Sequence, residues 1–340
     1  MRREIYPKDV IFLNNVTNTI KKYNLINDGD KLVLGVSGGP DSICMLDVLN
    51  RFKNNKEIKF EIAVAHINHM IRAEAVEDEK FVKNFCEKIN VPFYSRSIDV
   101  QKIANNNKIG TEEAGRNARY EFFDEILKQT NSNKIAIAHN KNDKAETILM
   151  NALRGSGIAG LRGIEPIKDN KYIRPLIECE RTEIEEYCKQ REINPRIDRT
   201  NFENVYTRNK IRNIVIPYIK QEFNPNIVET LNRLAELIKE DDEYIKKIVK
   251  EKYMDILIKE EEKQIILDLK KFNKEEKVIK AKILLYTITR LFGSTKGIEK
   301  IHIEDVIKLC DNNIGNKYLT PNKNIKILLK NHQIYIIKQS

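Results

Sequence analysis

Residues 37–42 read Ser-Gly-Gly-Pro-Asp-Ser, a loop composition suited to binding phosphate. An apolar run at 31–36 precedes this loop and an amphipathic run at 43–52 follows it, so we expect a strand, a tight turn and a helix. Gly38 and Gly39 lack side chains, and their backbone N–H groups can therefore approach phosphate oxygens closely. Because a helix N-terminus also attracts anions, the segment predicts an anion site.

The other loop residues indicate what kind of anion site this is. Ser37 and Ser42 can donate hydroxyl hydrogen bonds, but Asp41 would repel phosphate unless a cation lies beside it. Mg²⁺ resolves this conflict because it prefers carboxylate and phosphate oxygens. The loop lacks the lysine of a Walker A motif and the spacing of a Rossmann motif. An ordinary glycine turn, capped by Asp41 and Ser42, is the alternative.

Further candidates follow the other expected strands. His66, His69 and His139 lie at strand ends, and Asp143 and Glu146 share one face of an expected helix. We do not expect a zinc site, because no cysteine joins the histidines and their spacing fits no known metal motif. The alternatives are structural histidines and two acids at the solvated start of a helix.

A set of arginines could contact phosphates of a nucleotide or of RNA. Arg208 and Arg212 share a helix face within residues 205–220, a segment without acids. A solvated basic face is the alternative. The full set comprises Arg116, Arg119, Arg154, Arg174, Arg208 and Arg212.

Short apolar runs alternate with helical patterns over the first two thirds of the chain. This alternation predicts an α/β fold with a parallel sheet covered by helices on both faces. Ligands bind beyond the carboxyl ends of such strands, where the polar stretches above lie. Strands are expected at 31–36, 60–67, 91–98, 135–139 and 172–177, and helices at 43–52, 74–89, 111–127, 143–154 and 181–192.

The pattern changes near residue 216. Helical stretches at 227–250 and 274–292 dominate, and two runs within 325–337 predict a hairpin turning at Asn331 and His332. We therefore expect residues 1–216 to form one domain that contains the phosphate loop. Residues 217–340 are expected to form a smaller, mostly helical domain that ends in a β-hairpin.

Composition narrows the class of protein. The 340 residues carry a net charge of +10, which favours an anionic partner such as nucleic acid. Five cysteines without a C-x-x-C pair indicate small buried residues in a reducing compartment. Neither a signal-peptide core nor an apolar run of membrane-spanning length is present, so we expect a cytoplasmic protein. The sequence leaves open whether the protein forms a homodimer.

Residues 37–42 resemble the PP-loop of the ATP pyrophosphatase superfamily. Six further motifs in order make residues 30–217 similar to the tRNA(Ile)-lysidine synthases. These motifs lie at 65–72, 112–120, 138–147, 153–157, 173–176 and 206–212.

The resemblance implies a reaction in two steps on the isoleucine tRNA with a CAU anticodon. The wobble cytidine attacks the α-phosphate of ATP, and pyrophosphate leaves. Free L-lysine then displaces AMP from the activated ring carbon to form lysidine.

The resemblance also assigns roles to domains and residues. Residues 1–216 would be the PP-loop ATP-binding catalytic domain, and residues 217–340 would be the tRNA-binding domain. Asp41 and Asp143 would bind Mg²⁺, while Asp143 and Glu146 would hold the lysine ammonium group and help to remove its proton. His139 would lie on the lysine side. The implied catalytic residues are Asp41, Asp143, Glu146 and Arg212, and the implied nucleotide-binding residues are Ser37, Gly38, Gly39, Pro40, Asp41, Ser42, His66 and Arg116.

Departures from the family pattern leave rival interpretations. Asn142 stands where the family usually has a first aspartate before Asp143, and Met70-Ile71 replaces a usual Gly-Leu pair.

A tRNA-thiolating PP-loop enzyme that binds a cluster would need C-x-x-C pairs, and NAD synthetases and amidotransferase-type relatives lack the later motifs. The non-enzyme alternative is a tRNA or nucleotide binder that has lost catalysis.

Overall fold

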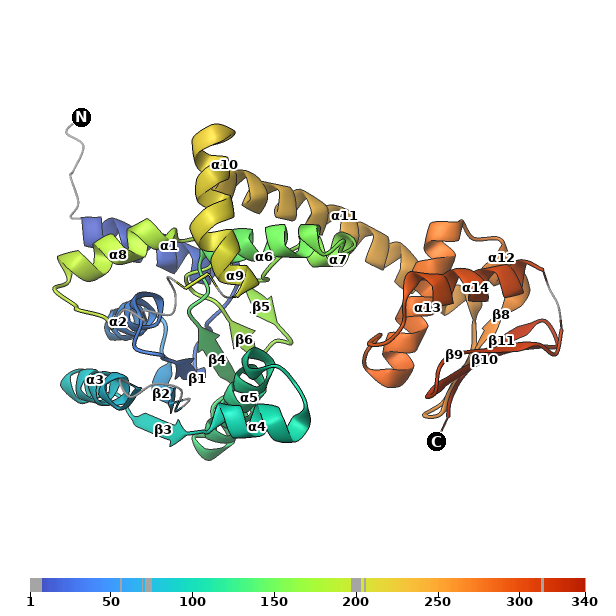
Figure 1. Cartoon of the computed structure of the whole chain (residues 1–340). Coiled ribbons are helices and arrows are strands. Elements are labelled where there is room, and N and C mark those ends of the chain that lie inside the picture. Colours follow the sequence, from blue (N-terminus) through green and yellow to red (C-terminus); the bar gives the residue numbers. More distant parts are fainter. Residues whose placement is uncertain are drawn as a thin grey trace. The chain divides into compact units, whose positions relative to one another are not determined.

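The computed structural model describes residues 8–55, 57–68, 70, 75–196, 203–204, 206–312 and 315–339. His69 and Arg72, which belong to a motif named above, lie outside the described residues. The chain forms two compact units, Met1–Ile238 and Lys239–Ser340 (Figure 1).

This division lies further along the chain than the boundary after residue 216 that we expected. Packing explains the difference, because Val228 shares a buried cluster with Ile211 of the first unit. The Asn232 side chain also donates to a backbone carbonyl at the start of α6 over 3.1 Å. Helix α11, Ile227–Ile256, begins in the first unit and ends in the second.

The first unit is built on a six-stranded sheet in the order β3-β2-β1-β4-β6-β5. All neighbouring pairs are parallel except β5 with β6. The chain moves from β1 to one side for β2 and β3 and then crosses to the other side for β4, so a topological switch point lies between β1 and β4. The strands are β1 Lys31–Gly35, β2 Glu61–Asn68, β3 Phe93–Ser97, β4 Lys134–Ile137, β5 Ile167–Lys168 and β6 Tyr172–Ile173.

Helices cover both faces of this sheet (Figure 1). Leu32 and Leu34 of β1 pack into one cluster with α1, α2 and α8, whereas Val33 packs into another with α5, because strand side chains alternate. The expected α/β class is therefore confirmed. The helices are α1 Lys8–Lys22, α2 Pro40–Asn54, α3 Ala75–Lys88, α4 Val100–Asn107, α5 Thr111–Gln129, α6 Lys141–Leu153, α7 Ile158–Leu161, α8 Arg181–Gln190, α9 Thr207–Lys210, the π-helix η2 Ile211–Val215 and α10 Ile216–Glu222.

The second unit combines helices with more strands than we expected. Its antiparallel sheet has the order β7-β8-β11-β10-β9, with β7 Leu257–Glu260, β8 Gln264–Asp268, β9 Tyr318–Asn322, β10 Ile325–Lys330 and β11 Gln333–Lys338. The expected hairpin is β10–β11, and its turn residues Asn331 and His332 both have positive φ, as a two-residue hairpin turn requires. The helices are α12 Leu269–Asn273, α13 Lys277–Phe292 and α14 Lys300–Asp311.

One face of this second sheet packs on the helices. Ile325, Ile327 and Leu329 of β10 are buried in the same cluster as residues of α13 and α14, while Lys326 and Lys330 alternate with them and are less buried. Among the helices that the structure describes, none is both long enough and apolar enough to cross a membrane.

Candidate active site

The glycine loop lies between β1 and α2, beside the switch point of the sheet. Gly38 has a φ of 96°, a left-handed conformation that favours glycine. The Ser42 hydroxyl accepts hydrogen bonds from the backbone N–H groups of Ser37 at 3.1 Å and Gly38 at 3.2 Å, and donates to Gly39 O at 3.0 Å. Pro40 opens α2, where its missing N–H costs nothing. The loop is thus shaped by its own residues.

Two residues outside the loop hold it in place. The His66 Nδ1 lies 2.8 Å from Val36 O, and burial lowers the pKa of this imidazole. Arg196 donates its backbone N–H to Gly38 O at 3.0 Å, and its guanidinium pairs with Asp78 at 3.0 Å. His66 therefore supports the strand end that leads into the loop. Sequence reasoning did not single out Arg196.

Asn140 links the loop to the acids on α6. It is fully buried, and its Nδ2 donates to Asp41 Oδ1 at 3.0 Å. Its Oδ1 accepts from the Asp143 N–H at 2.9 Å, and its own N–H donates to Asp143 Oδ2 at 3.1 Å, which forms a capping box. The acids at positions 41 and 143, predicted as one site, are therefore brought together by a residue that the sequence analysis missed.

Asp143 and Glu146 contact three arginines, and we call these five residues the acid–arginine cluster. Glu146 is 1% exposed, and both of its carboxylate oxygens accept hydrogen bonds from Arg212, at 2.7 and 2.8 Å. Arg208 adds a contact to Glu146 at 3.1 Å, and Arg181 adds one at 3.3 Å. Arg212 also reaches Asp143 Oδ1 at 2.9 Å. Such a buried network depends on every partner.

The electrostatics of these residues set Asp41 apart. Burial, and then the nearby charge of Asp143, raise the pKa of Asp41 to about 6, although Arg181 and Arg212 oppose the rise. Burial opposes the charge on Arg212, but its bonds to Glu146 and the charges of Asp143 and Asp41 outweigh that effect, and its pKa is raised. The positive charges near Asp41 therefore do not offset the effects of its burial and of the Asp143 charge.

This donor set fits Mg²⁺ bound together with phosphate. Among the residues that the structure describes, no group of three or more His, Cys, Asp or Glu side chains is arranged to hold a metal by itself. Mg²⁺ needs one or two carboxylates when phosphate oxygens and water supply the rest. Asp41, with its raised pKa, and Asp143, joined to it through Asn140, meet that requirement.

A second group of cations lies at the end of β4. Arg174 is 4% exposed, and its Nε donates to His139 Nδ1 at 3.1 Å. Arg116 packs on Tyr120, with its guanidinium 4.9 Å from the ring centroid, and its charge helps to lower the pKa of His139. Arg116 therefore lies on the His139 side of the sheet edge, whereas His66 lies at the end of β2.

Asn142, the departure from the family pattern, has a local role. Its Oδ1 accepts the backbone N–H of Arg181 at 3.0 Å, at the first residue of α8. This bond fixes the start of the helix that supplies Arg181 to the acid–arginine cluster. An aspartate could accept the same bond, so the contact does not require asparagine.

The cysteines are buried in the structure, and each is a free thiol. Burial raises the pKa of Cys179 and Cys44 above the usual range. They therefore behave as the small buried residues that we expected.

Comparison with known proteins identifies the family. Residues 9–219 match the PP-loop domain family. A tRNA(Ile)-lysidine synthase of Clostridioides difficile is 44% identical over 97% of this chain and 71% of its own length. That of Clostridium acetobutylicum is 46% identical over 91% of this chain and 67% of its own length. The chain belongs to the tRNA(Ile)-lysidine synthase family. Both relatives are longer than the region that matches this chain.

A solved structure shows the same fold in a different PP-loop protein. The U34-tRNA thiolase NcsA from Methanococcus maripaludis, with its [4Fe-4S] cluster, has a TM-score of 0.57 and 18% identity, covering 69% of this chain and 80% of the thiolase. At this identity the likeness concerns the fold alone. Membership of the tRNA(Ile)-lysidine synthase family rests on the sequence relatives.

Proposed function

We propose that this chain ligates free L-lysine to the wobble cytidine of CAU-anticodon tRNA(Ile), in the cytoplasm, through an adenylated cytidine. The observation that carries the proposal is the hydrogen bond from Asn140 to Asp41, which joins the glycine loop to the acid–arginine cluster. A nucleotide at the loop would have its α-phosphate beside both acids and arginines. Transfer of AMP needs such positioning and charge neutralisation.

The loop and the acids have separate tasks in this proposal. The first backbone N–H groups of α2 are not used within the helix and can receive phosphate oxygens. Asp41 and Asp143 would hold Mg²⁺, which supplies charge neutralisation at the phosphates when it is bound. Arg212 and Arg208 lie close enough to that position to donate to phosphate oxygens as well.

Lysine would meet Asp143 and Glu146, which already contact arginines. All the carboxylate oxygens of Glu146 accept from guanidinium groups, so an ammonium group must replace some of these contacts. We propose that bound phosphates attract the arginines away from the acids. The acids then hold the lysine ammonium and accept its proton before the attack on the activated ring carbon.

Replacement of Asp143 by asparagine tests this function. We expect Asp143→Asn to lower incorporation of labelled lysine into unmodified CAU-anticodon tRNA(Ile) by at least about 100-fold, because it removes a carboxylate from both proposed tasks. Incorporation is measured with ATP and Mg²⁺, alongside release of pyrophosphate.

Asn142→Asp is the matched control, since an aspartate can still accept the Arg181 N–H. It should incorporate lysine at close to the original rate. If wild-type protein releases pyrophosphate in a tRNA-dependent way without incorporating lysine, adenylation stands and lysine is not the nucleophile. Absence of both signals would favour the inactive binder.

We also propose that the second unit contacts the tRNA. Residues 312–340 contain five lysines and no acid, and β9 to β11 come from this segment. Lys326 and Lys330 lie on the face of β10 opposite its buried residues, and the Lys326 Nζ is 4.3 Å from the centre of the exposed Tyr318 ring. Lysines beside an exposed aromatic ring suit an RNA backbone and its bases.

The double change Lys326→Gln and Lys330→Gln should weaken binding of the tRNA about tenfold at low salt and reduce the slope of log affinity against log salt by about 2. Filter binding at several salt concentrations measures both quantities. Lys247→Gln, an exposed lysine on α11, is the control for loss of charge elsewhere in the unit. An unchanged slope in the double variant would place the RNA contact on another surface.

A further inference from the structure

His139 is a polar residue near the end of β4 to which the proposed reaction has given no step. It lies two residues after the end of β4, at the switch point, and its Nδ1 lies 3.1 Å from the Arg174 Nε. A guanidinium has donors and no acceptor, so the direction of this bond is certain. The Nδ1 must accept, and it therefore carries no proton. A neutral imidazole then has its proton on Nε2.

Arg174 is itself held firmly. It is almost fully buried, its Nη1 donates to Glu165 O at 2.5 Å, and its backbone N–H donates to Pro166 O at 3.0 Å. The guanidinium cannot turn away from His139 without leaving a buried donor without a partner, which is costly.

The charges that face His139 are positive. Burial, followed by the charges of Arg174, Arg208, Arg116 and Arg119, lowers the pKa of His139 to about 3. These arginines come from α5, α9 and the segment after β6. The imidazole therefore stays neutral near pH 7 and is a poor proton acceptor there.

The other ring nitrogen of His139, Nε2, is not used by the described residues. Among them, none forms a hydrogen bond with Nε2, and His139 is partly exposed. The charges of Arg174, Arg208, Arg116 and Arg119 act on the ring, so an anionic oxygen beside it would be stable.

We infer that Arg174 is a positioning residue that fixes His139 as the neutral Nε2–H tautomer, so that His139 donates a hydrogen bond to a phosphoryl oxygen of the bound nucleotide. This inference rests on the proposed adenylation for its substrate, although the tautomer itself does not. His139 thereby acts as a donor and not as the base that takes the proton from lysine. Loss of a donor to a developing charge typically slows an enzyme about 100-fold.

The tautomer is measured directly on the free, wild-type protein. Long-range proton–nitrogen NMR of protein labelled with ¹⁵N-histidine distinguishes the two ring nitrogens, and the His139 signal is assigned by its loss in His139→Gln. We expect protonated Nε2, unprotonated Nδ1 and no titration between about pH 5.5 and 8. A proton on Nδ1, or a titration within this range, would overturn the inference whatever the activity of the variants.

Variants test the roles of the two residues. Arg174→Met removes both the donor and a positive charge, so the His139 pKa should rise and an acidic limb should appear in the pH profile of pyrophosphate release. Arg174→Lys keeps the charge and a donor, and it should restore much of the wild-type profile. A shared loss in both variants with no change in the His139 signal would contradict a positioning role.

Changes at His139 separate a donor from a base. The amide nitrogen of glutamine can take the place of Nε2–H, so His139→Gln should retain activity within about tenfold of wild type, whereas His139→Ala should lose about 100-fold. Equal losses would overturn the donor role. Because the NMR measurement needs neither tRNA nor lysine, failure of lysine incorporation would reject the proposed function and leave the tautomer as measured.

Discussion

Glu146→Gln is expected to lower the free energy of unfolding by about 3 kcal/mol and to remove nearly all lysine incorporation. The Glu146 carboxylate is 1% exposed and accepts hydrogen bonds from Arg181, Arg208 and Arg212. Glutamine has nearly the same shape, but its NH₂ group would face a guanidinium donor. The change leaves three buried or half-buried cations with Asp143 as their remaining carboxylate in the acid–arginine cluster.

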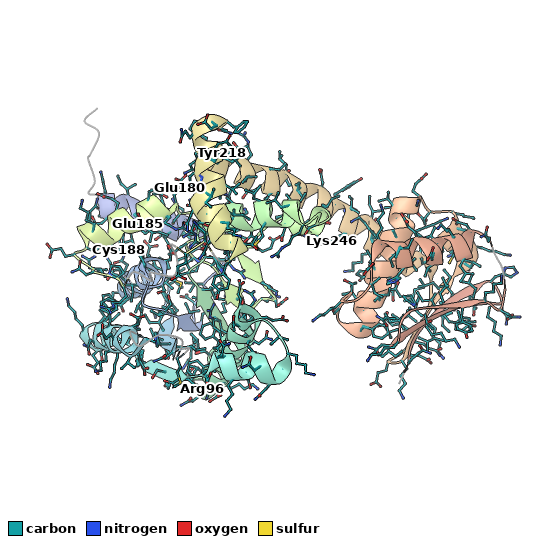
Figure 2. All side chains as sticks on the ribbon, in the orientation of Figure 1. Arg96, Glu180, Glu185, Cys188, Tyr218 and Lys246 are labelled. Carbon is teal, nitrogen blue, oxygen red and sulfur yellow. The ribbon has the colours of Figure 1, made fainter. Side chains whose placement is uncertain are left out.

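Urea unfolding followed by circular dichroism measures the loss of stability, and labelled lysine measures activity. Glu185→Gln is the control because Glu185 is an exposed glutamate on α8 (Figure 2), and its change should shift stability by no more than about 0.5 kcal/mol. If the two variants unfold alike, the arginines are held by something other than Glu146.

Asp41→Asn should have opposite effects on stability and on activity. The folded protein raises the pKa of Asp41 from 3.8 to about 6. A carboxyl group with a raised pKa binds its proton more tightly when folded, so stability is present at low pH and is lost as pH rises through about 6. At a pH of about 7.5 the ionised group then destabilises the fold, and asparagine should raise the free energy of unfolding by about 2 kcal/mol.

The same change should abolish ATP-dependent release of pyrophosphate, because the carboxylate proposed to hold Mg²⁺ is gone. Stability is compared by urea unfolding at about pH 7.5 and about pH 4, and the gain should vanish at the lower value. Asp169→Asn, at an exposed aspartate, should change neither quantity. A stability gain that persists unchanged at low pH would show that charge on Asp41 is not its cause.

The strands and the loop were predictable because their signals are local. The run 31–36 is mostly apolar, and glycines follow it. Neighbouring residues alone therefore predict both the strand and the turn. The hairpin at Asn331 and His332 was equally local. By contrast, β7, β8 and β9 are short segments of four or five residues without a clear alternating pattern, and they become strands by pairing with the hairpin and with each other.

The expected strand at 172–177 shows a limit of reading apolar runs. The structure keeps Tyr172–Ile173 as β6 and then turns, with Ile177 N–H bonded to Arg174 O. Pro175 has no N–H to donate to a neighbouring strand, and the residue before it is restricted as well. The turn is what buries Arg174 and directs it at His139.

The site was predicted in part. Asp143 and Glu146 were placed on one helix face from their spacing alone, and the structure agrees. Arg181 and Asn140 were missed because neither belongs to a pattern along the chain. Arg181 lies on α8, 35 residues after Glu146 in the sequence. Asn140 acts through its hydrogen bond to Asp41, in the loop after β1.

The sequence by itself determined the reaction class and the ordered residues that carry it, because a phosphate loop and a helix face are formed by neighbours in the chain. The tertiary structure alone decided which charges meet. Folding linked Asp41 to Asp143 through Asn140, surrounded Glu146 with three arginines from two segments, and set Arg174 against His139. Protonation states depend on burial and on distances across the sheet edge, and both are set only when the strands assemble.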